Sequence, residues 1–138
     1  MSADESLIGL VEVSKQEAQI LLEAGYLYME MGDFQAAQEI FEGCVSLLPR
    51  SDAPSVGLGN LLVTQGKHQE AIKAYQNAVK ISPESATAHA FLGEVLMLQG
   101  QTQQGQQSLQ KAIELSPEGA PPAELAQSLL KAAQEGVF

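Results

Sequence analysis

Cysteine and aromatic residues are scarce in this sequence. Of the 138 residues, one is a cysteine, none is a tryptophan and 5% are aromatic. A single cysteine cannot form a disulfide bond within the chain, and so few aromatic side chains disfavour a β-sandwich, whose strands are rich in them. Alanine, leucine, glutamine and glutamate are abundant instead, and these residues favour helices. The composition therefore predicts an all-α fold.

Basic residues are also few, which leaves the chain strongly acidic. Seven Lys and Arg residues stand against 17 Asp and Glu, a net charge of −10. The charge is concentrated in residues 1–52, where Lys15 and Arg50 are the only basic residues. Because an acidic surface repels phosphate groups, this charge disfavours nucleic acid and anionic membranes as partners and favours a basic protein.

Long hydrophobic runs are missing as well. No apolar stretch approaches the roughly 20 residues that a membrane-spanning helix needs. No charged start followed by an apolar run marks a signal peptide. We therefore expect a cytoplasmic protein without a membrane partner.

Glycine and proline recur along the chain with one common period. Three glycines are spaced 34 residues apart, and so are three prolines. Glycine ends a helix by adopting a left-handed conformation, and a residue that precedes proline is pushed out of helical geometry. Each period is therefore expected to hold two helices, the first ending at the glycine and the second before the proline. The recurring residues are Gly32, Gly66 and Gly100, and Pro49, Pro83 and Pro117.

A second set of small residues keeps the same period inside the expected helices. Small residues let two paired helices approach closely, and large side chains such as Phe41, Tyr75 and Leu109 then fill the space beside the next pair. The pattern therefore predicts helix pairs that stack on one another. The small residues are Gly25, Gly59 and Gly93, then Ala37 and Ala71, and then Cys44, Ala78 and Ala112.

Together these positions match a known repeat. The chain resembles the tetratricopeptide repeat family, whose 34-residue unit is a pair of antiparallel helices. The resemblance implies an all-α, right-handed solenoid that forms one domain over residues 1–138. The implied parts are an N-terminal segment, 1–17, three helix-turn-helix repeats, 18–51, 52–85 and 86–119, and a C-terminal capping helix, 120–138.

One residue departs from the family pattern. Gly105 stands where the family prefers alanine. A glycine inside a helix costs about 0.5–1 kcal/mol relative to alanine. We therefore expect the second helix of the third repeat to be locally loosened at this position.

The two ends of the chain lie outside the repeats. Pro121 and Pro122 are expected to open a last helix that carries one apolar stripe and caps the solenoid. At the other end, an apolar cluster precedes Ser14 and Glu17, which form a capping box and predict the start of a helix. The apolar residues 1–13 have two interpretations. They either pack on the first repeat as a cap or form an arm through which two copies make a homodimer.

Residues for catalysis are not grouped in the sequence. His68 and His89 fall in different repeats, and neither has a second histidine or cysteine at the spacing of metal ligands. No nucleophile can be paired with either histidine. Cys44 takes the place of a small alanine and is expected to be an inert, buried thiol. We therefore expect a protein that is not an enzyme and has no metal or cofactor.

The resemblance also implies where a ligand would bind. In this family the first helix of each repeat lines a concave groove, and members that read chaperone tails hold a terminal carboxylate with Lys, Arg and Asn. Only Asn60 is available here for such a clamp, so a protein that binds the C-terminal tail of a chaperone is disfavoured. The predicted groove residues are Tyr26, Met29, Glu30, Val56, Asn60, Val63, Ala90, Phe91, Glu94, Met97 and Leu98.

The expected groove is an apolar trough with an acidic border. Its methionines can repack around an irregular client, and its glutamates, Glu23, Glu30 and Glu94, would face basic residues of an amphipathic helix or an apolar extended segment. Small acidic three-repeat proteins of this kind resemble bacterial type III secretion chaperones, which hold an aggregation-prone needle or translocator subunit until export. The predicted function is a non-catalytic, protein-binding chaperone. Two alternatives are a scaffold adaptor that links folded proteins and a docking subunit of an enzyme complex.

Overall fold

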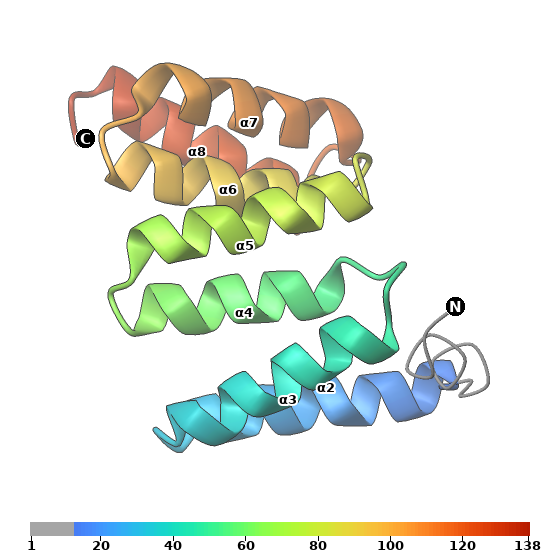
Figure 1. Ribbon diagram of the computed structural model, residues 1–138. Coiled ribbons are helices and arrows are strands. Elements are labelled where there is room, and N and C mark those ends of the chain that lie inside the picture. The colour runs from blue at the N-terminus through green and yellow to red at the C-terminus, as the bar shows by residue number, and fades with distance from the viewer. Residues whose placement is uncertain (1–12) are drawn as a thin grey trace.

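The computed structural model describes residues 13–138, and within them the chain forms seven α-helices and no strand. The all-α, solenoid-type prediction is confirmed (Figure 1). The interpretations of residues 1–13 as a cap or a dimer arm fall outside the described residues, apart from Val13. The helices are α2 (Lys15–Glu30), α3 (Phe34–Leu47), α4 (Ala53–Thr64), α5 (His68–Ile81), α6 (Ala86–Leu98), α7 (Thr102–Leu115) and α8 (Pro121–Gln134).

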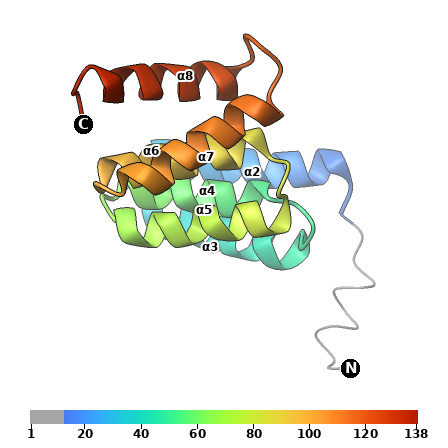
Figure 2. The ribbon, with the colours of Figure 1, turned by 90° about the horizontal axis from the view of Figure 1, so that it is seen from above.

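Consecutive helices pack as three pairs, α2 with α3, α4 with α5 and α6 with α7. Each pair stacks on the next, and α8 packs against both α6 and α7 (Figure 1). Seen along the stack in Figure 2, α3 and α5 lie on one side, and α8 lies farthest out on the side of α2. We call the side formed by α2, α4, α6 and α8 the inner face.

The turns within the pairs depend on glycine, as the period predicts. Gly32, Gly66 and Gly100 have φ angles of 80°, 76° and 77°. Residues other than glycine rarely adopt this left-handed backbone conformation. After the first of these turns, Asp33 starts α3, because its carboxylate accepts a hydrogen bond of 3.2 Å from the backbone N–H of Ala36.

Large side chains fit against glycines on neighbouring helices. Phe41 of α3 is fully buried, and a Cβ atom added at Gly25 would lie 2.7 Å from its ring. A Cβ atom at Gly57 of α4 would meet the same ring at 2.5 Å. Gly25 therefore allows the close packing within the first helix pair, and Gly57 allows the close packing of the second pair on the first.

Gly105 does not loosen α7, which runs without a break from Thr102 to Leu115. A Cβ atom at this position would lie 2.8 Å from Sδ of Met97 and 3.1 Å from the backbone oxygen of Gly93. The glycine therefore lets α7 approach α6 closely. This contact is the physical reason why the expected loosening is absent.

The ends of the described chain agree with the sequence signals. Ser14 caps α2 by accepting a hydrogen bond of 3.1 Å from the backbone N–H of Glu17, and Pro121 begins α8. The apolar stripe of α8, including Leu125 and Leu129, packs against a buried cluster that contains Leu109 of α7. The last helix thus closes one end of the core.

Candidate functional site

Two adjoining cavities lie along the inner face, and together we call them the inner trough. The first has a volume of about 330 Å³ and lies between α2, α4 and the start of α6. The second has about 370 Å³ and lies between α6 and α8. Thr87 lines both, so the two cavities are adjacent. The first is lined by Leu22, Tyr26, Asp52, Ala53, Val56, Ser85 and Thr87, and the second by Thr87, Ala90, Phe91, Pro121, Pro122 and Leu125.

The second cavity is almost wholly apolar. Apart from Thr87, all the side chains that line it are hydrocarbon, and Pro121, Pro122 and Leu125 come from α8. The ring of Phe91 stacks on that of Tyr75, with the ring centroids 5.9 Å apart and the planes inclined by 22°. This aromatic contact holds Phe91 in place as one wall of the cavity.

The middle of the inner face contains a hydrogen-bond network that joins two repeats. Nδ2 of Asn60 donates to the hydroxyl oxygen of Tyr26 at 3.0 Å, and the hydroxyl of Tyr75 donates to Oδ1 of Asn60 at 2.6 Å. Burial raises the pKa of both tyrosines, so the phenols keep their protons. Asn60 is thus engaged by the protein itself, although it was the one residue expected to suit a carboxylate clamp.

Glu94 occupies the same repeat position as Tyr26 and Asn60, 34 residues further along. It is half-buried, and burial raises the pKa of its carboxyl group above the ordinary value of 4.5. Its charge in turn contributes to the raised pKa of Tyr75, after the larger effect of burial. The carboxyl group is therefore close to the network but lies outside the walls of the two cavities.

The predicted groove residues fall into three groups. Those that line the trough are Tyr26, Val56, Ala90 and Phe91. Those that are half-buried beside it are Met29, Asn60, Val63 and Glu94, and those that are exposed are Glu30 and Leu98.

Met97 differs from the expectation that it lines the groove. Its side chain is 2% exposed and packs in the cluster that contains Leu109 of α7 and Ala126 of α8. The reason is that α8 covers this part of α6. Met97 therefore belongs to the core beneath the trough.

The groove residues predicted above do not include Leu22, Ala53, Ser85 and Thr87, which also line the trough. Two further omissions change its character most. One is Asp52, which directly precedes α4 and was treated only as part of the acidic charge. The other is the start of α8, with Pro121, Pro122 and Leu125, which was expected only to cap the solenoid. A signal for Asp52 was present, because Pro54 in the first turn of the helix has no backbone N–H for Asp52 to cap, which leaves the carboxylate free.

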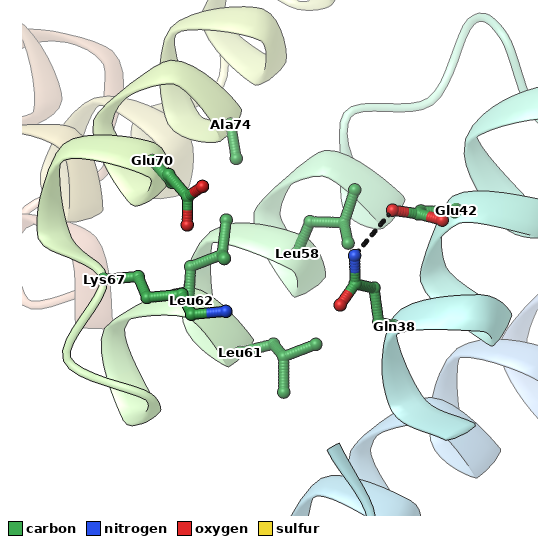
Figure 3. A pocket seen from close by; sticks show the side chains of 8 residues that line it. All are labelled: Gln38, Glu42, Leu58, Leu61, Leu62, Lys67, Glu70 and Ala74. Carbon is green, nitrogen blue, oxygen red and sulfur yellow. Dashed lines mark hydrogen bonds between the residues drawn. The ribbon is translucent and has the colours of Figure 1, made fainter. Parts of the chain in front are cut away.

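A further cavity of about 230 Å³ lies between α3 and α5 and has a different character (Figure 3). Leucines of α4, among them Leu58 and Leu62, form part of its lining, while Glu42, Glu70 and Lys67 add charges of both signs. Nε2 of Gln38 donates a 2.9 Å hydrogen bond to Glu42 (Figure 3). The lining of the inner trough, by contrast, contains no basic residue, and its one charged side chain is the acidic Asp52.

Other candidate chemistry is absent from the part of the chain that the structure describes. Cys44 is 2% exposed, and burial raises the pKa of its thiol, as expected for an inert cysteine. Among residues 13–138, no three His, Cys, Asp or Glu side chains group as a metal site. None of the described helices combines the length and the hydrophobicity needed to span a bilayer.

Comparison with known protein families identifies the repeats. A family model described as TPR repeat matches residues 59–100, and one described as tetratricopeptide repeat matches residues 18–50 and 86–118. Together the matches cover more than half of the chain. No curated protein matches the sequence significantly.

Solved structures with the same fold have low sequence identity to this chain. The type III secretion chaperone SycD of Yersinia enterocolitica, in complex with a peptide of the translocator YopD, has a TM-score of 0.76 and 20% identity, over 93% of this chain and 100% of that chain. PcrH from Pseudomonas aeruginosa has a TM-score of 0.77 and 20% identity, over 91% and 97%. The first TPR of Spaghetti (RPAP3), bound to the HSP90 peptide SRMEEVD, has 0.72 and 16%, over 90% and 98%. These likenesses confirm the solenoid fold.

Proposed function

The chain belongs to the tetratricopeptide repeat family, and from this premise we propose that it is a non-catalytic chaperone that holds a segment of a client protein in the inner trough. The observation that carries the proposal is that the two cavities adjoin at Thr87. Two adjoining, mostly apolar cavities on one face fit one extended or helical segment better than two separate small molecules. The client segment is apolar or amphipathic, because the lining is mostly hydrocarbon.

The narrower proposal is that the client is a translocator subunit of a type III secretion system. SycD with a YopD peptide and PcrH with the chaperone binding region of PopB support it, since both have the fold of this chain. Such a chaperone acts in the cytoplasm, without nucleic acid or membrane as partner. We further propose that residues 1–138 form one domain with the repeat boundaries given by the 34-residue period.

The chemistry of the trough argues against a reader of chaperone tails. The TPR of Spaghetti (RPAP3) shares the fold and binds the HSP90 peptide SRMEEVD, which contains three acidic residues and ends in a carboxylate. The lining of the trough here contains Asp52 and no basic residue, and Asn60 is already bonded to two tyrosines. An acidic tail would be repelled and would find no clamp.

The adaptor alternative has one observation in its favour. The cavity between α3 and α5 (Figure 3) lies outside the inner face and offers a second surface. An adaptor would bind partners that are each folded alone, whereas the client of a chaperone is unstable when it is free. The state of the isolated partner therefore separates the two functions.

The test is co-purification from the native host, with mass spectrometry and the stoichiometry of the complex. We expect one dominant, otherwise insoluble protein at a fixed ratio. Thr87→Trp should abolish its capture, because the exposed Thr87 stands where both cavities meet. Leu47→Trp is the matched control, since Leu47 is exposed on α3. If Thr87→Trp captures the client as well as the unchanged protein does, the trough is not the binding site.

A further inference from the structure

We propose that the first cavity of the trough binds a basic side chain of the client segment, and that Asp52 is the residue that recognises it. The proposal rests on the proposed function, because it describes what the trough selects in a client. It differs from the expectation drawn from the sequence, in which the glutamates of the border faced the basic residues.

The carboxylate of Asp52 is free for such a contact. Asp52 occupies the N-cap position of α4, but its side chain makes no capping hydrogen bond. Pro54, at the second position of α4, has no backbone N–H that Asp52 could cap. Oγ of Ser51, the residue before Asp52, accepts a hydrogen bond of 3.3 Å from the backbone N–H of Ala53. By contrast, Asp33 and Ser85, at the starts of α3 and α6, both cap with their side chains. The carboxylate of Asp52 therefore lines the cavity without capping the helix that it precedes.

No cation of the described chain neutralises Asp52. Arg50 is two residues away but forms no ion pair with it, and the one ion pair within residues 13–138 joins Lys111 to Glu114. The start of α6 also faces this cavity through Ser85 and Thr87. It contributes a partial positive charge of about half a unit, as does the start of α4 beside Asp52. Among the side chains that line the cavity, Asp52 carries the one formal charge, and it is negative.

The shape of the cavity suits a long basic side chain. The side chains beside Asp52 are mostly apolar, with Leu22, Ala53 and Val56 in the lining. Lys and Arg pack their methylene groups on apolar surface while the charged end reaches a polar partner. Asp52 is half-buried, so its pairing with a cation is screened less than that of an exposed residue.

Glu94 is less suited to the same role. It lies outside the walls of both cavities, and burial favours its neutral form by raising its pKa. The second cavity, which adjoins the first at Thr87, would then take an apolar side chain of the same segment. The predicted client motif is a basic residue close to a large apolar one.

The test uses fluorescein-labelled, amidated 12-residue peptides that carry one Phe and one Arg at separations of two, three and four residues. Each has a partner in which citrulline replaces Arg, which removes the charge and keeps the shape. Fluorescence anisotropy gives the dissociation constants. We expect at least one Arg peptide to bind about tenfold more tightly than its citrulline partner, and Asp52→Asn to remove this preference. Glu39→Gln, which removes a charge from an exposed residue of α3, should retain it.

The outcomes separate this proposal from the proposed function. If the Arg and citrulline peptides bind equally, and Thr87→Trp abolishes the binding of both, the trough holds segments but Asp52 does not select a cation. If Asp52→Asn keeps the full preference for Arg, another acidic residue recognises the basic side chain and the proposal is wrong. If no peptide of the series binds, the proposal is wrong, while capture of a client that Thr87→Trp abolishes would still support the proposed function.

Discussion

Tyr75 of α5 donates a hydrogen bond of 2.6 Å to Asn60 of α4, which joins the two helices of one pair. Asn60 in turn donates a hydrogen bond to Tyr26 of the preceding pair. Asn60→Ala would leave the hydroxyl groups of the buried Tyr75 and the half-buried Tyr26 without their partner. We expect a loss of about 1–3 kcal/mol in the free energy of unfolding. Urea denaturation measures it, with Gln76→Ala, an exposed residue of α5, as the control. A loss equal to that of the control would mean that the network does not stabilise the stack.

Two glycines inside helices predict changes of opposite sign. A Cβ atom at Gly105 would crowd Met97 and the backbone of Gly93, so Gly105→Ala should lower the free energy of unfolding by about 1–3 kcal/mol. Gly43 in α3 is exposed and has no atom within 4 Å of an added Cβ, so Gly43→Ala should raise it by about 0.5–1 kcal/mol. Thermal or urea unfolding of both variants checks the pair. The same sign for both would contradict the close contact between α6 and α7.

Glu94 predicts a dependence of stability on pH. Its pKa is higher in the folded chain than the ordinary value of 4.5, so the neutral form is favoured by folding. Its contribution is therefore fully present below pH 4.5 and is lost as the pH rises through the folded pKa. Glu94→Gln should remove this part of the loss, and unfolding at pH 4 and pH 7 measures the difference. Glu30→Gln, at an exposed position, is the control, and identical pH profiles of the two variants would refute the prediction.

Cys44 should react slowly with thiol reagents in the folded protein. Its side chain is 2% exposed, and burial raises the pKa of the thiol, so both access and the thiolate fraction are reduced. We expect labelling by a chromogenic disulfide reagent to be at least tenfold faster in urea than in native buffer. A cysteine placed at the exposed Ser46 of α3, in a chain with Cys44→Ala, should react quickly in both. Fast native labelling of Cys44 would contradict the packing of α3.

Features set by local backbone chemistry could be predicted from the sequence. Gly32 and its two equivalents end helices because of a conformation that belongs to glycine itself, and Asp33 caps the next helix through its own side chain. Gly25 was expected to let two paired helices approach closely, because small residues recur there with the 34-residue period, and a Cβ atom at Gly25 would lie 2.7 Å from the ring of Phe41. Such features do not depend on how the end of the chain packs.

The parts that escaped prediction depend on contacts between elements distant in the sequence. Met97 shares its repeat position with Met29 and Val63, which are half-buried, but it is buried because α8 covers α6. Asp52 lines the trough because the start of α4 lies beside α2 and the start of α6, which supply the rest of the lining. Neither outcome follows from the residue type or from the period alone.

The central claim is that a client segment lies in the inner trough. It is tested most directly by a photo-crosslinking amino acid placed at residue 87 in the native host, with mass spectrometry of the adducts and the same residue at position 47 as the control. The account predicts one dominant adduct from position 87, to an apolar segment that carries a basic residue, and none of that protein from position 47. Adducts to the same protein from position 47, with none from position 87, would contradict the claim and would place the client on the opposite side of the solenoid.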